Sequence, residues 1–209
     1  MVIYRVTATF ALYYDMKGVL FLASHLGSGS DHLFRTLASL PRIEGIRTGM
    51  SYDHYDKIES LVANPHKYNK SNAIWMDELL YNHSFTCKHL LPYLKFVFVL
   101  REPAGSLAQM VAEGWSLEEA SRYYRYRLVG LCEYAVRSRG LVLTHDRMGD
   151  VGRLAGYLAL KGSETEACLS LKAAVSLVSE TVIPSETLLP CERAYERHLG
   201  HLITAGLLT

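Results

Sequence analysis

The feature that most constrains the fold of this chain is an apolar run, Gly18 to Ser24, that ends in small residues. An apolar run without polar interruption is typical of a strand buried on both faces. The pattern returns in residues 95–100 and, in shorter form, in residues 141–144. Because helical stretches separate these runs, the sequence predicts an α/β fold with a central parallel β-sheet covered by helices on both sides.

Helical periodicity predicts the covering elements. A Ser-x-x-Glu capping box opens each of two expected helices, at residues 116–139 and 163–178. A third helical pattern spans about 191–205, after a pair of prolines, whereas residues 45–70 show weak periodicity and are expected to be mostly loop. Since no internal repeat or linker interrupts the pattern, we expect one domain.

The bulk composition fits one domain over residues 1–209, with core motifs in 17–160 and C-terminal helices in 163–205. Lys and Arg total 22 against 21 Asp and Glu. Without a global positive field, neither nucleic acid nor an anionic membrane is an expected partner, and any anion site must be local. No run reaches the roughly 18 apolar residues of a membrane helix.

The cysteines indicate a reducing compartment. They are widely spread and form no Cys-x-x-Cys pair: Cys87, Cys132, Cys168 and Cys191. We expect buried, reduced thiols rather than disulfides or a zinc site, and a cytoplasmic location.

A loop rich in small residues follows the first predicted strand. Gly27 and Gly29 permit backbone angles that let successive amides turn toward one anion, and the next helix adds its unpaired N–H groups. Ser28 and Ser30 add hydroxyl donors. The alternative is an ordinary strand-to-helix turn in which Ser and Asp cap the helix. The loop lacks the Gly-Lys-Ser/Thr of a Walker A motif, which disfavours a nucleotide kinase or GTPase.

An arginine follows the second apolar run. Arg101 stands directly beyond residues 95–100, and Pro103 suits the first turn of a following helix. The carboxyl ends of strands form the ligand-binding edge of open α/β sheets, where a guanidinium binds phosphate through two parallel hydrogen bonds. The alternative is an arginine at a helix start paired with Glu102 or a neighbouring carboxylate.

Together these segments resemble the sulfotransferase family, which uses 3′-phosphoadenosine-5′-phosphosulfate (PAPS). In that family a strand leads into a Pro-Lys/Arg-Ser-Gly-Thr/Ser-Thr/Ser loop, and a later strand ends in Arg-Asp/Asn/Glu-Pro. Residues 21–33 and 96–103 take these two positions, and residues 141–148 resemble a late strand with an acidic turn. The resemblance implies a single-domain, P-loop NTPase-like fold of the sulfotransferase type.

The resemblance also implies site residues. Gly27, Ser28, Gly29, Ser30 and Asp31 would hold the 5′-phosphosulfate, and Arg101 would bind the 3′-phosphate. Gln109 stands where the family has a serine that also binds this phosphate, and Ser106 lies nearby but off register. The chain departs from the family motif at Gly27, where a basic residue is usual.

Histidines are the remaining candidates for chemistry. The segment around His83 resembles a family motif that carries the acceptor's base, so His83 is the predicted catalytic base, ahead of Asp77 and Glu78. His25 or His32 would replace the charge missing at position 27, or would be turn and cap residues.

The long helix at 116–139 is basic and aromatic. We expect a solvated face for its arginines, which are Arg122, Arg125, Arg127, Arg137 and Arg139, and a packing role for Tyr123, Tyr124 and Tyr126. His198 and His201 are spaced for metal ligation, but no third ligand motif accompanies them, and the family requires no metal.

The sequence therefore predicts transfer of a sulfuryl group from PAPS to a hydroxyl or amine of a small-molecule or glycan acceptor, with the desulfated nucleotide PAP as product. Two alternatives remain open: a nucleotide-binding protein of this fold that has lost catalysis, and another phosphate-binding enzyme such as a small-molecule kinase. Residues 45–80 and the C-terminal helices are expected to line the acceptor pocket.

Overall fold

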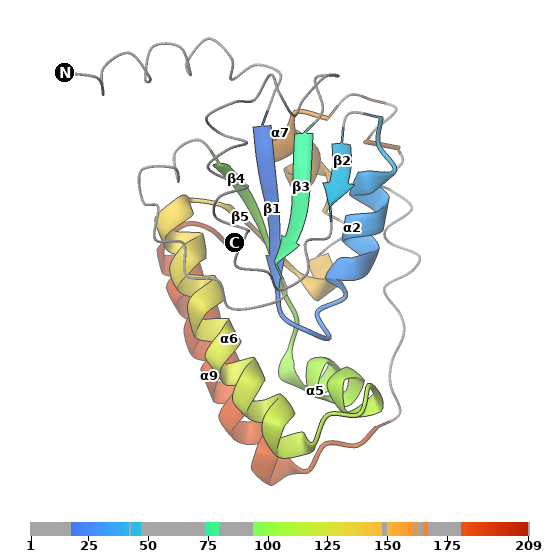
Figure 1. The fold of residues 1–209 in the computed structure, drawn as a ribbon. Helices are drawn as coiled ribbons and strands as arrows, with labels where there is room; N and C mark the ends of the chain where they lie inside the picture. The colour runs from blue at the N-terminus through green and yellow to red at the C-terminus, as the bar shows by residue number, and fades with distance from the viewer. Residues whose placement is uncertain are drawn as a thin grey trace, which may run out of the picture.

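Five parallel strands form the central sheet in the order β2-β3-β1-β4-β5 (Figure 1). The computed structural model of the protein describes residues 18–41, 43–46, 74–79, 94–147, 150–160, 162, 165–166 and 181–208. In chain order the strands are β1 (Gly18–Ser24), β2 (Ile43–Ile46), β3 (Ile74–Leu79), β4 (Leu94–Leu100) and β5 (Leu141–Thr144).

The central strand β1 is hydrogen-bonded on both sides. Phe21 stands in register with Asp77 of β3 and with Phe96 of β4. Because all pairings are parallel, the carboxyl ends of the strands share one edge of the sheet. The predicted glycine loop and Arg101 therefore emerge from neighbouring strands at the same edge.

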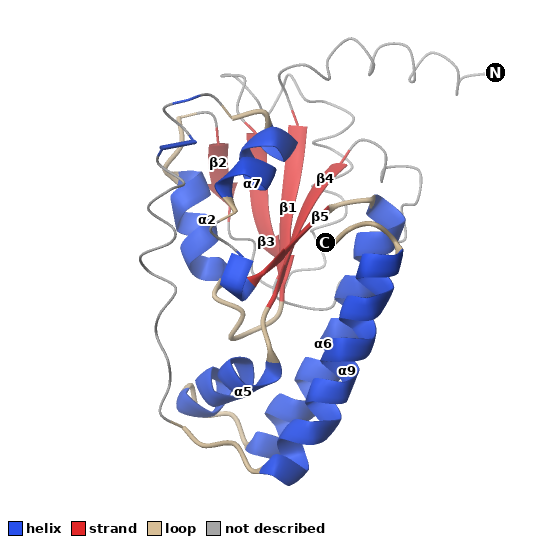
Figure 2. Cartoon of the chain, turned by 180° about the vertical axis from the view of Figure 1, so that it is seen from behind, coloured by secondary structure: helices blue, strands red, loops and turns tan. Residues whose placement is uncertain are grey.

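Helices cover both faces of this sheet (Figures 1 and 2). One face packs against α5 (Pro103–Ala112), α6 (Leu117–Ser138) and α9 (Ser185–Thr204), and the opposite face packs against α2 (Ser30–Ala38) and α7 (Val151–Leu158). A short 3₁₀ turn, η2 (His145–Arg147), follows β5.

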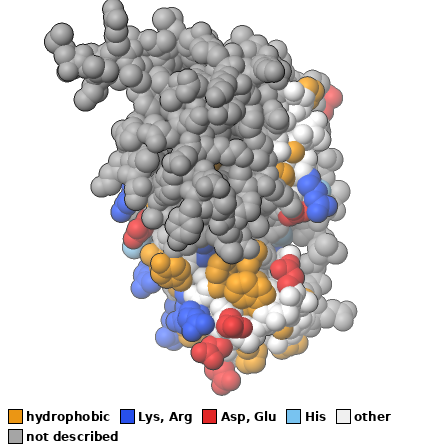
Figure 3. Space-filling model, viewed as in Figure 1, with side chains coloured by type: hydrophobic (Ala, Val, Ile, Leu, Met, Phe, Trp, Pro, Cys, Tyr) orange, Lys and Arg blue, Asp and Glu red, His pale blue; other side chains and the backbone are white. Residues whose placement is uncertain are grey.

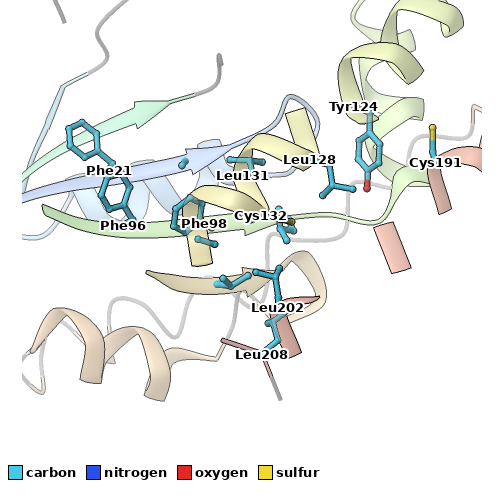
Figure 4. Close-up of a cluster of buried hydrophobic side chains, with 14 of the residues drawn as sticks. Phe21, Phe96, Phe98, Tyr124, Leu128, Leu131, Cys132, Cys191, Leu202 and Leu208 are labelled. Carbon is cyan, nitrogen blue, oxygen red and sulfur yellow. The ribbon is translucent and has the colours of Figure 1, made fainter. Parts of the chain in front are cut away.

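The alternation of side chains along each strand supplies two separate cores. On the α6 face, Phe21 and Phe96 pack with their ring centroids 5.3 Å apart, and Leu128 and Leu202 close this layer from the helices (Figure 4). On the other face, Leu20 and Leu22 of the same strand contact residues of α2 and α7. A strand buried on both sides fits the apolar run that predicts it.

The predicted strands at residues 18–24, 95–100 and 141–144 are confirmed. The prediction of loop from residue 45 is wrong at its start, since Gly45 and Ile46 belong to β2. Both β2 and β3 escape prediction for physical reasons. The first has only four residues, and Asp77 and Glu78 interrupt the apolar pattern of the second.

The helix expected at 116–139 is also confirmed, with its reciprocal capping box between Ser116 and Glu119. The predicted start of the last helix near Cys191 is wrong: α9 begins at Ser185 and continues through Pro190. Packing of α9 against α6 outweighs the hydrogen bond that a proline removes. The helix expected at 163–178 lies mostly outside the described residues.

None of the described helices combines the length and the apolar character needed to cross a membrane.

Candidate functional site

The loop between β1 and α2 has the backbone geometry of an anion cradle. Gly27 and Gly29 both adopt left-handed conformations, with φ of +73° and +81°. Among the described residues, the amides of these two glycines have no hydrogen-bond partner. Gly29 is the N-cap of α2 and has no side chain to cap the helix. The alternative of a turn capped by Ser and Asp is met only for serine, since the hydroxyl of Ser28 accepts from the amide of Ser30, the first residue of α2. The N-cap residue of α2 therefore supplies no side-chain acceptor of its own at this end of the helix.

The serines of the loop fix its shape. The hydroxyls of Ser24 and Ser30 lie 2.8 Å apart, and the hydroxyl of Ser28 accepts a 3.3 Å hydrogen bond from the amide of Ser30. Asp31 points elsewhere: its carboxylate forms a 2.8 Å ion pair with Arg35 on the exposed side of α2. Any contribution of Asp31 to anion binding must therefore come from its backbone.

Arg101 is folded onto this loop. Its side chain is buried, and Nη1 donates to the carbonyl oxygen of Gly27 at 3.0 Å and to Oε1 of Gln109 at 3.2 Å. The Nε atom is buried without a hydrogen-bond partner, but it forms a 3.5 Å ion pair with the carboxylate of Glu102, so the pairing expected in the alternative is present as well. A buried guanidinium nitrogen without a hydrogen bond is a costly arrangement, and an anionic ligand would relieve it.

Two residues of α5 support the arginine. Gln109 accepts from Arg101 and donates its amide nitrogen to Glu113 at 3.1 Å, so it orients the guanidinium. The hydroxyl of Ser106 donates to the carbonyl oxygen of Glu102 at 2.9 Å and is thereby engaged within its own helix.

The backbone of Ser106 explains the glycine at position 27. A Cβ atom built on Gly27 would lie 2.6 Å from the carbonyl oxygen of Ser106, closer than real Cβ contacts allow. Together with the left-handed backbone, this contact excludes a side chain at Gly27 unless the loop moves. The packing of this loop against α5 therefore requires a glycine at position 27, which explains why the basic residue is absent.

His25 does not supply the missing charge. The ring is fully buried, and its Nε2 accepts a 3.1 Å hydrogen bond from the amide of Arg101. Because Nε2 is an acceptor, Nδ1 carries the proton that is donated to the carbonyl of Leu26 at 2.8 Å. Burial lowers the pKa of His25 to about 4, so the imidazole is neutral at physiological pH. It is a turn residue that ties the loop to the end of β4.

The side chain of His32 takes no part in this network. His32 lies on α2, and its Nε2 is buried without a hydrogen-bond partner. His83 lies outside the described residues. Asp77 and Glu78 belong to the carboxyl half of β3, beside β1.

Arg127 is a site residue that sequence reasoning missed. The prediction of a solvated face is confirmed for Arg122, Arg125, Arg137 and Arg139 but is wrong for Arg127, which is only 3% exposed. Its Nε donates a 2.8 Å hydrogen bond to the carbonyl oxygen of Ser24, at the base of the loop. Burial lowers its pKa to about 10, so it keeps its charge at neutral pH. The signal was its helical spacing from the buried Tyr124 and Leu131.

Two further side chains reach the loop from other elements. Nδ1 of His145, just beyond β5, lies 3.0 Å from the carbonyl oxygen of Ser28 and donates to it. The hydroxyl of Tyr123 accepts a 3.2 Å hydrogen bond from the amide of Leu26. The packing role predicted for Tyr124 is confirmed, since it is fully buried and donates to the carbonyl of Arg101 at 2.8 Å. The same prediction is wrong for Tyr126, whose side chain is exposed.

Two cavities adjoin this network. One, of about 480 Å³, lies at the ends of β4 and β5 and is lined by Glu102, Thr144 and His145 together with residues of α9. The other, of about 730 Å³, lies at the turn between α5 and α6 and includes Tyr123. Both volumes fall in the range of small-molecule sites.

The described cysteines, Cys132 and Cys191, are free and buried, as predicted. Burial raises the pKa of Cys132 to about 12, so it is an inert thiol. His198 and His201 pack edge to face on α9 with ring centroids 5.9 Å apart. Within the described part of the chain, no group of three or more potential ligands is arranged to hold a metal.

Comparison with solved structures supports the fold. The chain is similar to the crystal structure of mouse sulfotransferase SULT7A1 complexed with PAP, with a TM-score of 0.53 over 92% of this chain and 88% of that one. The sequence identity is 11%, so the similarity concerns the fold alone. No protein-family model and no curated protein sequence matches the chain. The protein therefore has an α/β fold of the sulfotransferase type.

Proposed function

We propose that this protein binds PAPS at the loop after β1 and transfers its sulfuryl group to a hydroxyl or amine of a small-molecule or glycan acceptor. The observation that carries the proposal is the contact between Arg101 and Gly27, which joins the two motifs at 3.0 Å in a fold shared with a PAP-bound sulfotransferase. A reducing, cytoplasmic setting fits the free thiols of Cys132 and Cys191.

The residues present fit such a nucleotide. The amides of Gly27 and Gly29, the hydroxyls of Ser28 and Ser30 and the start of α2 would hold the 5′-phosphosulfate. Arg101 would bind the 3′-phosphate through its buried Nε, held in orientation by Gln109. The cavity of about 480 Å³ beside Glu102 and His145 would take the nucleoside.

Two arginines that contact the carbonyl groups of the loop would neutralise the negative charge of the phosphosulfate. Since Gly27 excludes a side chain, the positive charges would be those of Arg101 and Arg127, which among the described residues donate to the carbonyls of Gly27 and Ser24. Two buried guanidinium groups stabilise an anion without reorganising during reaction, as electrostatic catalysis requires.

The chemistry needs one proton acceptor. A lone pair of the acceptor oxygen or nitrogen attacks sulfur, the bond from sulfur to the bridging oxygen breaks, and its electron pair leaves with PAP. The acceptor proton passes to a base, for which His83 remains our choice. Most of the rate would come from positioning and from stabilisation of the leaving oxygen.

Binding of PAP tests the first half of the proposal. Millimolar PAP should raise the melting temperature, since a ligand that binds only the native state stabilises it. Arg101→Met should lower the affinity for PAP by about tenfold to a hundredfold, the loss expected for a hydrogen bond to a charged group. The exposed Arg137→Met is the matched control and should bind PAP normally. No shift with PAP, or a shift with ATP alone, would refute the nucleotide assignment and favour a kinase.

A catalytically inactive binding protein is the second candidate, and the loop's exclusion of a side chain at Gly27 favours it. Transfer of labelled sulfate from PAPS to a panel of acceptors separates the two. Wild-type turnover that His83→Ala abolishes would support the enzyme with this base. PAP binding without turnover on any acceptor would support the binding protein, and equal turnover in both proteins would remove His83 as the base.

A further inference from the structure

The turn between α5 and α6 forms a cavity of about 730 Å³ whose described lining is aromatic and charged: Glu113, Trp115, Glu119, Arg122, Tyr123 and Tyr126. Figure 3 shows hydrophobic side chains beside acidic and basic ones on the lower part of the molecule, where α5 and α6 lie in Figure 1. This cavity is separate from the one at the ends of β4 and β5.

The aromatic side chains in the lining, Trp115, Tyr123 and Tyr126, suit a flat or cationic group. The rings of Trp115 and Tyr123 lie 5.3 Å apart at an angle of 53°. Tyr126 is 66% exposed, so its ring is accessible to a ligand in the cavity that it lines. Trp115 and Tyr123 also pack against the core on the α6 face, whereas the exposed ring of Tyr126 can attract a planar ring by stacking and an ammonium group through the ring quadrupole.

The charges of the lining favour a cation. The lining contains two carboxylates, those of Glu113 and Glu119, and one guanidinium, that of Arg122. The side chain and backbone of Ser116 donate to the carboxylate of Glu119 and lower its pKa, so this group is ionised at neutral pH. A ligand that carries a carboxylate or sulfate would meet this negative excess.

Two chains of contacts connect the cavity to the loop. The hydroxyl of Tyr123 accepts from the amide of Leu26, the residue before Gly27. On the opposite side, Glu113 accepts from Gln109, which in turn accepts from Arg101. A molecule lying against Tyr123 is therefore next to the proposed phosphosulfate site.

From this lining we infer that the α5–α6 cavity is the acceptor site and that its acceptor is a ring compound bearing an ammonium group. The assignment of this cavity as an acceptor site rests on the proposed function, sulfuryl transfer from PAPS. The cationic group would lie among the aromatic rings and Glu113, and the nucleophilic hydroxyl or amine would point toward the loop.

Three phenols that differ only in charge test the preference: tyramine, 4-(2-hydroxyethyl)phenol and 4-hydroxyphenylacetate. Calorimetry on the full chain, with and without PAP, gives their dissociation constants. The amine should bind about tenfold more tightly than the carboxylate, with the neutral alcohol between them. The order of transfer rates from PAPS should be the same.

Single substitutions locate the site. Glu113→Gln should reduce the preference for tyramine over the neutral alcohol, whereas Tyr126→Ala should weaken all three ligands. Glu118→Gln, an exposed change on α6 outside the cavity, is the control and should leave the order intact. Equal binding of the amine and the carboxylate, or an order that Glu113→Gln leaves unchanged, would overturn the inference.

The readouts separate the two proposals. The PAP-induced shift in melting temperature reports on the nucleotide site alone. A normal PAP shift without amine preference refutes the acceptor site and leaves the nucleotide site standing. An amine preference without a PAP shift refutes the reaction, and with it the role of the cavity as an acceptor site.

Discussion

The loop after β1 and the cavity at the α5–α6 turn lie side by side but are built differently. In the loop region His25, Arg101 and Arg127 are buried and form hydrogen bonds with backbone groups. At the cavity, Tyr126 is 66% exposed, and Trp115 is only partly buried. The same atoms that shape the loop would hold its ligand, so substitutions there should affect stability. Substitution of the exposed Tyr126 at the cavity should affect binding alone.

The largest effect should follow from Gly27→Lys, the change that restores the family's basic residue. A side chain at this position combines left-handed backbone strain with a 2.6 Å contact to the carbonyl of Ser106. We expect a loss of about 3–5 kcal/mol in the free energy of unfolding, measured by urea denaturation, and no gain in sulfate transfer.

Gly206→Lys is the matched control. Gly206 has a similar φ of +71°, but a Cβ atom added there would meet no heavy atom within 4 Å. Only backbone strain remains, so about 1–2 kcal/mol should be lost. Equal losses in the two variants would show that the contact with Ser106 does not determine the glycine at position 27.

Acid should weaken the loop before it weakens the cavity. The native pKa of His25 is about 4, against an ordinary value of 6.5, because of burial and the nearby charges of Arg127, Arg101 and His145. The unfolded chain therefore binds a proton that the native state excludes. Stability from this group is complete above pH 6.5 and falls as the pH drops toward 4, by about 3 kcal/mol in total.

His25→Gln removes the titrating group. The difference in unfolding free energy between wild type and variant, followed from pH 7.5 to 4, should shrink as the pH falls. A difference that stays constant across this range would mean that His25 has the same pKa in the native and the unfolded state, contrary to its burial and to its hydrogen bond from the amide of Arg101.

The sequence was sufficient for the strands that carry unbroken apolar runs and for helices with capping signals. β1 and α6 have such signals, because burial on both faces and a reciprocal cap are local properties. β3 and the start of α9 do not. Asp77 and Glu78 interrupt the apolar pattern of β3, which forms because it pairs with β1. Pro190 is a helix-breaking signal inside α9, a helix that tertiary packing maintains.

The candidate site divides in the same way. Arg101 follows from a motif at the end of a strand, and its contact with the loop was foreseeable from the parallel topology. The contact of Arg127 with the loop was not predicted, because a basic residue on a basic helix is expected to be solvated. Only its spacing from the buried residues of α6 indicates that it lies on the buried face. The neutral state of His25 depends on the amide of a residue far along the chain, which no local pattern reveals.

Gln109→Leu should have an intermediate effect that connects the two regions. The amide links Glu113, at the cavity, to Arg101, at the loop. Without it, the guanidinium loses one acceptor and part of its orientation, so PAP should bind up to about tenfold more weakly, a loss of about 1 kcal/mol. Calorimetry with PAP measures this. Unchanged PAP affinity would mean that Arg101 is oriented by Gly27 alone.

The smallest effects should come from two tyrosines within one turn of α6. Tyr124→Phe removes the 2.8 Å hydrogen bond to the carbonyl of Arg101 from a fully buried site and should cost about 1 kcal/mol of stability. Tyr126→Phe changes an exposed side chain and should alter stability by less than about 0.5 kcal/mol. Since both remove one hydroxyl from the same helix, their difference measures burial and partner directly. Equal losses of unfolding free energy in urea denaturation would contradict the comparison, in which the loop depends on its own polar contacts and the cavity is open for a ligand.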